Sequence, residues 1–294
     1  MSIAAATILE RITLPAPFGV VFRDIATGMR VDEGLAVTLT GAGGRSVPVA
    51  VNRSGVWFAR NLPGVADAVL SDTADWTTLG RDYRLEVRDT LGRFLPLAVT
   101  VRLPHRGLYA WPGWSALPRP LLMPLVDVPP NGTIADGWLP LFSAATRSIS
   151  APMAEVRATL VDRTTGDPAA WALVTASHDG RTRGLGMAGA DGQIALFFPY
   201  PPLPQPGVAD SPPAITDYRW PLTLAAYTQA LPPGATPDLA ALAAQLTHPA
   251  TLYAATTEPP EALPAQAVSL GRALTLRTTA TPGGPTSALF LGTD

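Results

Sequence analysis

The chain has 294 residues, of which 47% are hydrophobic and 15% charged, a composition typical of a packed globular protein despite 32 prolines and 26 glycines. It has no cysteine and all 21 basic residues are arginine, so disulfides, thiol catalysis, Schiff-base lysines and phosphate-loop lysines are excluded. The net charge of -2 offers no electrostatic attraction for nucleic acid or anionic lipid.

Short strands and turns fill the first third of the chain. The expected strands cover residues 8–14, 20–22, 35–39, 47–51, 56–58, 83–87 and 95–103. In most of them apolar and polar residues alternate, which is the period of a half-buried strand. Between them lie turns rich in glycine, asparagine and aspartate. About seven or eight strands with frequent turns predict a first β-sandwich over residues 1–104.

Residues 105–137 form a proline-rich arm between two predicted domains. The recurring prolines exclude a continuous helix or a central strand. The arm is nevertheless apolar, and apolar side chains of this size favour burial. We expect an ordered, extended arm that packs on one or both sandwiches and leaves part of its apolar face for a partner. The predicted partner contacts are Tyr109, Trp111, Trp114, Leu121, Leu122 and Met123.

Residues 138–294 predict a second β-sandwich, with a loop and helix insertion over about 201–264. The helix is expected to start at Thr236, because a threonine N-cap followed by Pro237 at the first position is a strong start signal. The apolar face of this helix consists of Leu239, Leu242 and Leu246. The predicted fold is therefore all-β, with two sandwiches and one short helix in the second.

An internal repeat is the clearest feature of the sequence. An apolar strand, a D-x-x-T-G turn and a second strand occur twice, and a turn glycine precedes a third strand in both copies. Three landmarks at a nearly constant offset predict a duplicated module. In both turns we expect the aspartate to cap local amides and the glycine to adopt a positive φ. The matched landmarks are Gly28 with Gly166, Gly55 with Gly192, and Tyr83-Arg84 with Tyr218-Arg219.

On these residues the first domain resembles the carboxypeptidase regulatory-like module, a transthyretin-like β-sandwich of the immunoglobulin-like class. The residues that match the family pattern are Asp24, Thr27, Gly28, Val31, Gly55, Trp57, Leu62, Pro63, Gly64, Tyr83, Leu85 and Val87. In the second domain Phe198-Pro199-Tyr200-Pro201 replaces the family's L-P-x-G. The resemblance implies a binding or structural module, because this family places its peptidase chemistry in a separate domain.

The whole-chain arrangement, two modules joined by a proline-rich arm, also resembles accessory proteins of phage-tail-like contractile injection systems. This resemblance implies a structural subunit in a cap, a baseplate or an adaptor. It also implies other protein subunits as partners, and leaves a homo-oligomer open.

No group of residues in the sequence is arranged for chemistry. The histidines His105, His178 and His248 are far apart and lack metal-ligand spacing, which favours solvent-facing loop positions. Aspartates such as Asp162 and Asp191 flank turns, and without a D-x-D-x-D-G run they favour turn capping over a calcium loop. We therefore expect no catalytic residue, no metal and no cofactor.

The sequence thus favours a non-enzymatic structural or assembly subunit, of a contractile injection or phage-tail-like particle. The alternative is a carbohydrate- or surface-binding adhesion module. Its motivation is the set of aromatic residues in the arm and the loops, because aromatic rings also stack on sugars. For the same residues, packing between the two domains is a third interpretation.

Overall fold

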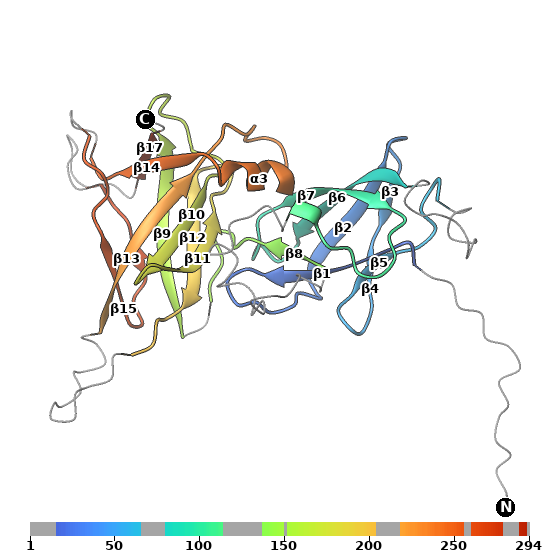
Figure 1. Cartoon of the computed structure of the whole chain (residues 1–294), viewed down its shortest axis with the longest axis horizontal. Helices are drawn as coiled ribbons and strands as arrows, with labels where there is room; N and C mark the ends of the chain where they lie inside the picture. The colour runs from blue at the N-terminus through green and yellow to red at the C-terminus, as the bar shows by residue number, and fades with distance from the viewer. Residues whose placement is uncertain are drawn as a thin grey trace, which may run out of the picture.

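The computed structural model describes residues 16–65, 80–113, 137–149, 152–203, 218–255, 260–278 and 288–292. Within these ranges the protein is mostly β-strand, with one short helix (Figure 1). The all-β prediction is therefore confirmed. The strand expected over residues 8–14 lies outside the described residues.

Two four-stranded sheets form the N-terminal half, residues 16–149. One has the order β4-β5-β1-β8 and the other the order β3-β2-β6-β7. Their strands are β1 (Phe18–Asp24), β2 (Leu35–Gly41), β3 (Ser46–Pro48), β4 (Ala50–Val51), β5 (Trp57–Ala59), β6 (Arg81–Asp89), β7 (Leu97–Leu103) and β8 (Trp138–Leu141). Alternate residues of β1 and β6, such as Phe18, Val20, Leu85 and Val87, are buried in one core. The apolar residues of the period-two pattern thus lie on the inner faces of a sandwich, and the residues between them lie on its outer faces.

One connected sheet forms most of the C-terminal half, residues 152–292. Its main path runs β11-β10-β13-β14-β17-β9-β12, with β15 on β13 and β16 on β9. The strands are β9 (Met153–Asp162), β10 (Leu173–His178), β11 (Arg181–Met187), β12 (Gln193–Pro199), β13 (Arg219–Tyr227), β14 (Pro249–Tyr253), β15 (Gln266–Ser269), β16 (Leu274–Thr275) and β17 (Ala288–Gly292). The strands of this sheet contribute to a second core of buried residues, which includes Val156, Leu196, Phe198 and Trp220.

The sequence repeat is also a repeat of strand pairing. Antiparallel pairing joins β1 to β5 and β9 to β12, with Val20 opposite Trp57 and Ala158 opposite Ile194. Parallel pairing joins β1 to β8 and β9 to β17. Both halves therefore place their last strand beside their first.

The two D-x-x-T-G turns have the same backbone. The amide of Gly28 donates to the carbonyl of Asp24 over 2.8 Å, and that of Gly166 to Asp162 over 2.9 Å. Gly28 has φ 71° and Gly166 has φ 77°, as the turn interpretation predicts. The third pair of sequence landmarks does not occupy equivalent positions in the two halves. Tyr218 precedes β13, whereas its proposed equivalent Tyr83 lies within β6.

Residues 138–141 belong to the sheet of the N-terminal half. We assigned them to the start of the second sandwich, but β8 pairs with β1 from Val21 opposite Trp138 to Asp24 opposite Leu141. The sequence could not show this, because parallel pairing with a strand more than a hundred residues earlier leaves no local pattern. By hydrogen bonding, the C-terminal half begins at β9.

Helix α3 (Leu239–Gln245) starts two residues later than the predicted N-terminus. Its N-cap is Asp238, whose carboxylate accepts from the amide of Ala240, and not Thr236. The reason is a tertiary contact: the carbonyl of Pro237 accepts from the amide of Ala98 in β7, which holds this segment extended. The helix therefore lies beside β7 of the N-terminal half (Figure 1).

The larger hydrophobic core is shared by the two halves. Its members from the N-terminal half include Phe22, Leu139 and Phe142, and those from the C-terminal half include Trp171, Met187 and Leu242. The structure therefore does not separate the halves into two independent cores, and the division into two domains stays a prediction. Trp171 precedes β10 with a φ of 64°, and its carbonyl accepts from Gln245.

We predict that Gly166→Ala lowers the free energy of unfolding by about 1 kcal/mol, because alanine resists a left-handed φ. A methyl group at Gly166 would meet no atom within 4 Å, so the cost is one of backbone conformation alone. Urea denaturation measures the difference. Gly166→Asn is the control and should cost less, since asparagine tolerates this conformation. An alanine variant as stable as the wild type would contradict the turn geometry.

Candidate functional site

The described part of the chain contains no group of three or more histidine and acidic residues arranged to hold a metal ion. His248 is exposed, but His105 and His178 are partly buried, in contrast to the solvent-facing positions expected from the sequence. His178 closes β10 with its Nδ1 2.8 Å from the carbonyl oxygen of Pro221, and His105 packs against the ring of Tyr109. These histidines serve packing and local hydrogen bonding.

The structure places two of the predicted partner contacts inside the protein. Tyr109 is 5% exposed and Trp111 is 8% exposed, and both belong to the larger core. For these two residues the structure favours the core interpretation over an external interface. Trp114, Leu121, Leu122 and Met123 lie outside the described residues.

Tyr109 fixes the start of the arm to the first sandwich. Its ring packs on Phe18, its amide donates to the carbonyl of Gly19 over 2.6 Å, and its hydroxyl donates to Thr100 over 3.4 Å. Burial, with the nearby Asp238 carboxylate as a second cause, raises the pKa of Tyr109 to about 12. The phenol is therefore neutral at physiological pH.

A buried ion pair anchors the segment that joins the two halves. Arg147, six residues after β8, donates through Nη1 to Asp24 Oδ1 over 2.9 Å and through Nη2 to Asp24 Oδ2 over 2.7 Å. The two side chains are 11% and 5% exposed. The same Nη1 also donates to Ser143 Oγ over 2.8 Å. This paired geometry is the strongest form of an arginine–carboxylate contact.

Burial alone would raise the pKa of Asp24, since it disfavours the charged form. The hydrogen bonds from Arg147 and Thr27, the charge of Arg147 and the amide of Ala26 outweigh burial, so the pKa lies below its usual value. The carboxylate is therefore charged wherever the protein is folded near neutral pH.

Aromatic rings from both halves flank the guanidinium of Arg147. Its Cζ lies 4.7 Å from the ring centroid of Phe94 and 5.9 Å from that of Phe197 in β12. From β9, Arg157 donates to the carbonyl of Arg147 over 2.8 Å and also to that of Ala145. We call this set, Asp24, Phe94, Arg147, Arg157 and Phe197, the junction clamp. It binds one segment to both halves.

Sequence reasoning missed the junction clamp. It assigned Asp24 to turn capping, which is correct but incomplete, because the carboxylate accepts from the amide of Ala26 as well as from Arg147. The only local signal for Arg147 was its place shortly after a strand, which many surface arginines share.

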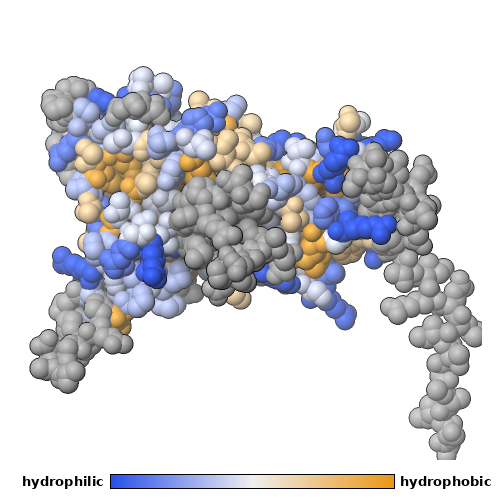
Figure 2. Space-filling view, in the orientation of Figure 1, coloured by the Kyte–Doolittle hydropathy of each residue, from blue (hydrophilic) through white to orange (hydrophobic). Residues whose placement is uncertain are grey.

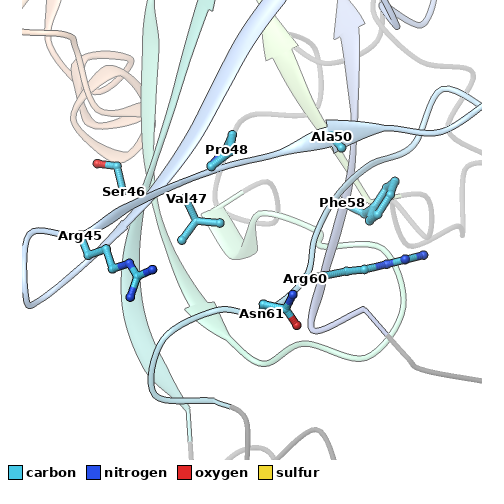
Figure 3. A pocket seen from close by; sticks show the side chains of 8 residues that line it. All are labelled: Arg45, Ser46, Val47, Pro48, Ala50, Phe58, Arg60 and Asn61. Atoms are coloured by element: carbon cyan, nitrogen blue, oxygen red, sulfur yellow. The ribbon is translucent and has the colours of Figure 1, made fainter.

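A hollow of about 430 Å³ opens at the edge of the first sandwich (Figure 3). Its lining residues are Arg45, Ser46, Val47, Pro48, Ala50, Phe58, Arg60 and Asn61. In the figure Val47 lies between Arg45 on one side and Asn61 with Arg60 on the other. The guanidinium of Arg60 lies 5.1 Å from the ring centroid of Phe58. The hollow thus combines two cations with an apolar floor.

No protein-family profile matches this chain, and no curated protein matches it significantly. Within the described ranges, no helix has both the length and the hydropathy needed to cross a bilayer. Arguments about function therefore depend on the geometry above.

We predict that Arg147→Ala lowers the free energy of unfolding by about 3–5 kcal/mol, because it leaves the buried Asp24 carboxylate without its cation. Chemical denaturation measures this loss. The matched control is Asp162→Asn at the equivalent turn, where the carboxylate accepts only from the amides of Thr164 and Thr165 among the described residues. The control should cost clearly less. A loss in Arg147→Ala no larger than that of the control would contradict a stabilising role of the buried ion pair.

Acid should release the junction clamp. Because the folded-state pKa of Asp24 is lowered, its stabilisation is complete above the unfolded-state pKa of about 3.9 and is lost as pH falls through the folded value. We expect the stability difference between wild type and Asp24→Asn to be largest at neutral pH and to vanish in strong acid. Urea titrations across this range test it. A difference that grows on acidification would contradict the lowered pKa.

Tyr109→Ala and Trp111→Ala should each destabilise the fold, by about 3–5 kcal/mol, because both side chains fill the larger core. Thermal melts followed by circular dichroism provide the measurement. If the variants melt at the same temperature as the wild type, the core interpretation is wrong and the predicted partner surface is favoured.

Proposed function

We propose that this chain is a non-enzymatic structural subunit of a larger protein assembly, of the contractile injection or phage-tail-like type. The observation that carries the proposal is the coupling of the two halves by a shared core and the junction clamp. Such a construction holds two sandwiches at a fixed spacing. A spacer or adaptor needs this property, whereas a pair of independent binding modules does not.

The titratable groups with a shifted pKa in the described part of the chain support a structural role. The four carboxyl and phenol groups whose pKa is shifted, Asp24, Tyr83, Asp89 and Tyr109, are each engaged in structural contacts. Asp89, for example, accepts from the guanidinium of Arg93 and the amide of Phe94. None of them faces the hollow of Figure 3.

The surface offers room for protein contacts. Figure 2 shows hydrophobic residues gathered over the upper part of the C-terminal half and around α3. Apolar surface of this kind often marks contact with another protein. The resemblance of the first sandwich to the carboxypeptidase regulatory-like module agrees with a structural role, and is part of the proposal.

The alternative, a carbohydrate-binding module, loses part of its support. It depended on exposed aromatic residues in the arm, and Tyr109 and Trp111 are buried. Sugar binding needs an accessible ring beside convergent polar groups.

Sedimentation of a lysate of the source cells tests the proposal. We expect the chain to co-sediment with a particle of high mass, and mass spectrometry of that fraction to identify tube, sheath or baseplate subunits. Arg147→Ala should reduce this incorporation, because it loosens the spacing of the two halves. Recovery of the chain only as a free protein, together with retention on a glycan array, would favour the alternative.

A further inference from the structure

The hollow at the edge of the first sandwich exists because strand pairing stops at Pro48. β4 pairs with β5 through Ala50 opposite Phe58, and continuation of this ladder would bring Pro48 opposite Arg60. Proline has no amide to donate, so pairing ends there and the two chain segments diverge. Asn61 then turns the second segment away with a φ of 53°. The gap between residues 45–48 and 60–61 is the hollow (Figure 3).

The edge of β3 beside this gap has main-chain groups that pair with no residue of the described ranges. β3 pairs with β2 at Leu39 opposite Val47, and the amide of Val49 donates to Val37. In an antiparallel ladder the residues between such pairs turn their main-chain groups outward. The amide and carbonyl of Ser46 therefore face away from β2, and β3 is the last strand of its sheet. An extended peptide can pair with such an edge.

Two cations flank this edge, and neither has a carboxylate partner among the described residues. Neither Arg45 nor Arg60 forms an ion pair with any described residue, in contrast to Arg84, Arg93 and Arg102 of the same half. Both are exposed, and the stacking of Arg60 on Phe58 limits the directions that its guanidinium can take. The lining contains no acidic residue. The charge that would complement this hollow is negative.

We propose that the hollow receives an extended, acidic peptide segment of a partner subunit. The segment pairs with the outward main-chain groups of Ser46, places carboxylates on Arg45 and Arg60, and covers Val47 and Pro48 with an apolar side chain. This inference rests on the proposed role as an assembly subunit and names the chemistry of the partner. A guanidinium binds a carboxylate through two parallel hydrogen bonds, which gives direction as well as affinity.

The test uses a blocked peptide of about seven residues in which valine and aspartate alternate, the pattern of a strand with one acidic face. Titration calorimetry in low salt measures its binding to the full chain. We expect the Arg45→Ala/Arg60→Ala variant to bind at least about tenfold more weakly, since two charge-assisted contacts are lost. Arg53→Ala, an exposed arginine of the same half outside the hollow, should bind like the wild type.

Two further probes distinguish the kind of ligand. A peptide with serine in place of aspartate should bind at least about tenfold more weakly than the acidic one, since it lacks the charge. An oligosaccharide of uronic acids carries the carboxylates without a peptide backbone and should also bind more weakly. The proposal is overturned by an absence of peptide binding, by an equal loss in Arg53→Ala, by equal binding of the serine peptide, or by tighter binding of the uronic acids.

Co-sedimentation separates this proposal from the proposed function. If the wild type enters a particle and the Arg45→Ala/Arg60→Ala variant enters it equally well, the hollow is not the docking site although the structural role stands. If the wild type enters no particle, the structural role itself fails, whatever the peptides show.

Discussion

The buried pair of Asp24 and Arg147 is the constraint on which the arrangement of the two halves depends. A carboxylate buried at the end of β1 needs a cation, because an unpaired buried charge is costly. The cation that pairs with it is Arg147, which comes from the segment after β8. Arg147 is also in contact with Arg157 and Phe197 of the C-terminal half. One local requirement for charge neutralisation thus fixes a long-range geometry.

The two copies of the repeat use the same turn differently. In the first, the aspartate is buried and paired with an arginine of the junction clamp. In the second, Asp162 is half-buried and accepts only from local amides among the described residues. The two turns have the same backbone, and in the described residues the first also contributes to the coupling between halves through the junction clamp. The helix segment adds a second contact, because Pro237 pairs with Ala98 of β7.

The sequence could predict those features of the fold that depend on residues close together in the chain. Strand positions followed from alternation, and the positive φ of Gly28 and Gly166 followed from turn chemistry, because both depend on near neighbours. What failed depends on distant partners. The place of β8 in the first sheet, the later start of α3 and the junction clamp each arise from contacts between residues far apart in the chain.

The sequence also could not predict the interaction surfaces, because these depend on contacts between distant residues. The sequence placed a partner surface on the arm through its aromatic residues, yet Tyr109 and Trp111 fill the core. The hollow with Arg45 and Arg60 escaped notice because its residues come from two segments that meet only through the β4–β5 pairing. The sequence does not distinguish Arg45 and Arg60 from the other arginines, since all 21 basic residues are arginine.

Differential scanning calorimetry of the full chain tests most directly whether the two halves act as one body. A shared core, and the contacts of Arg157 and Phe197 with the segment that carries Arg147, should make the unfolding of the two halves cooperative. We predict a single transition whose calorimetric enthalpy equals its van't Hoff enthalpy. Two separable transitions in the wild-type protein would contradict the coupling, and with it the spacer role that depends on it.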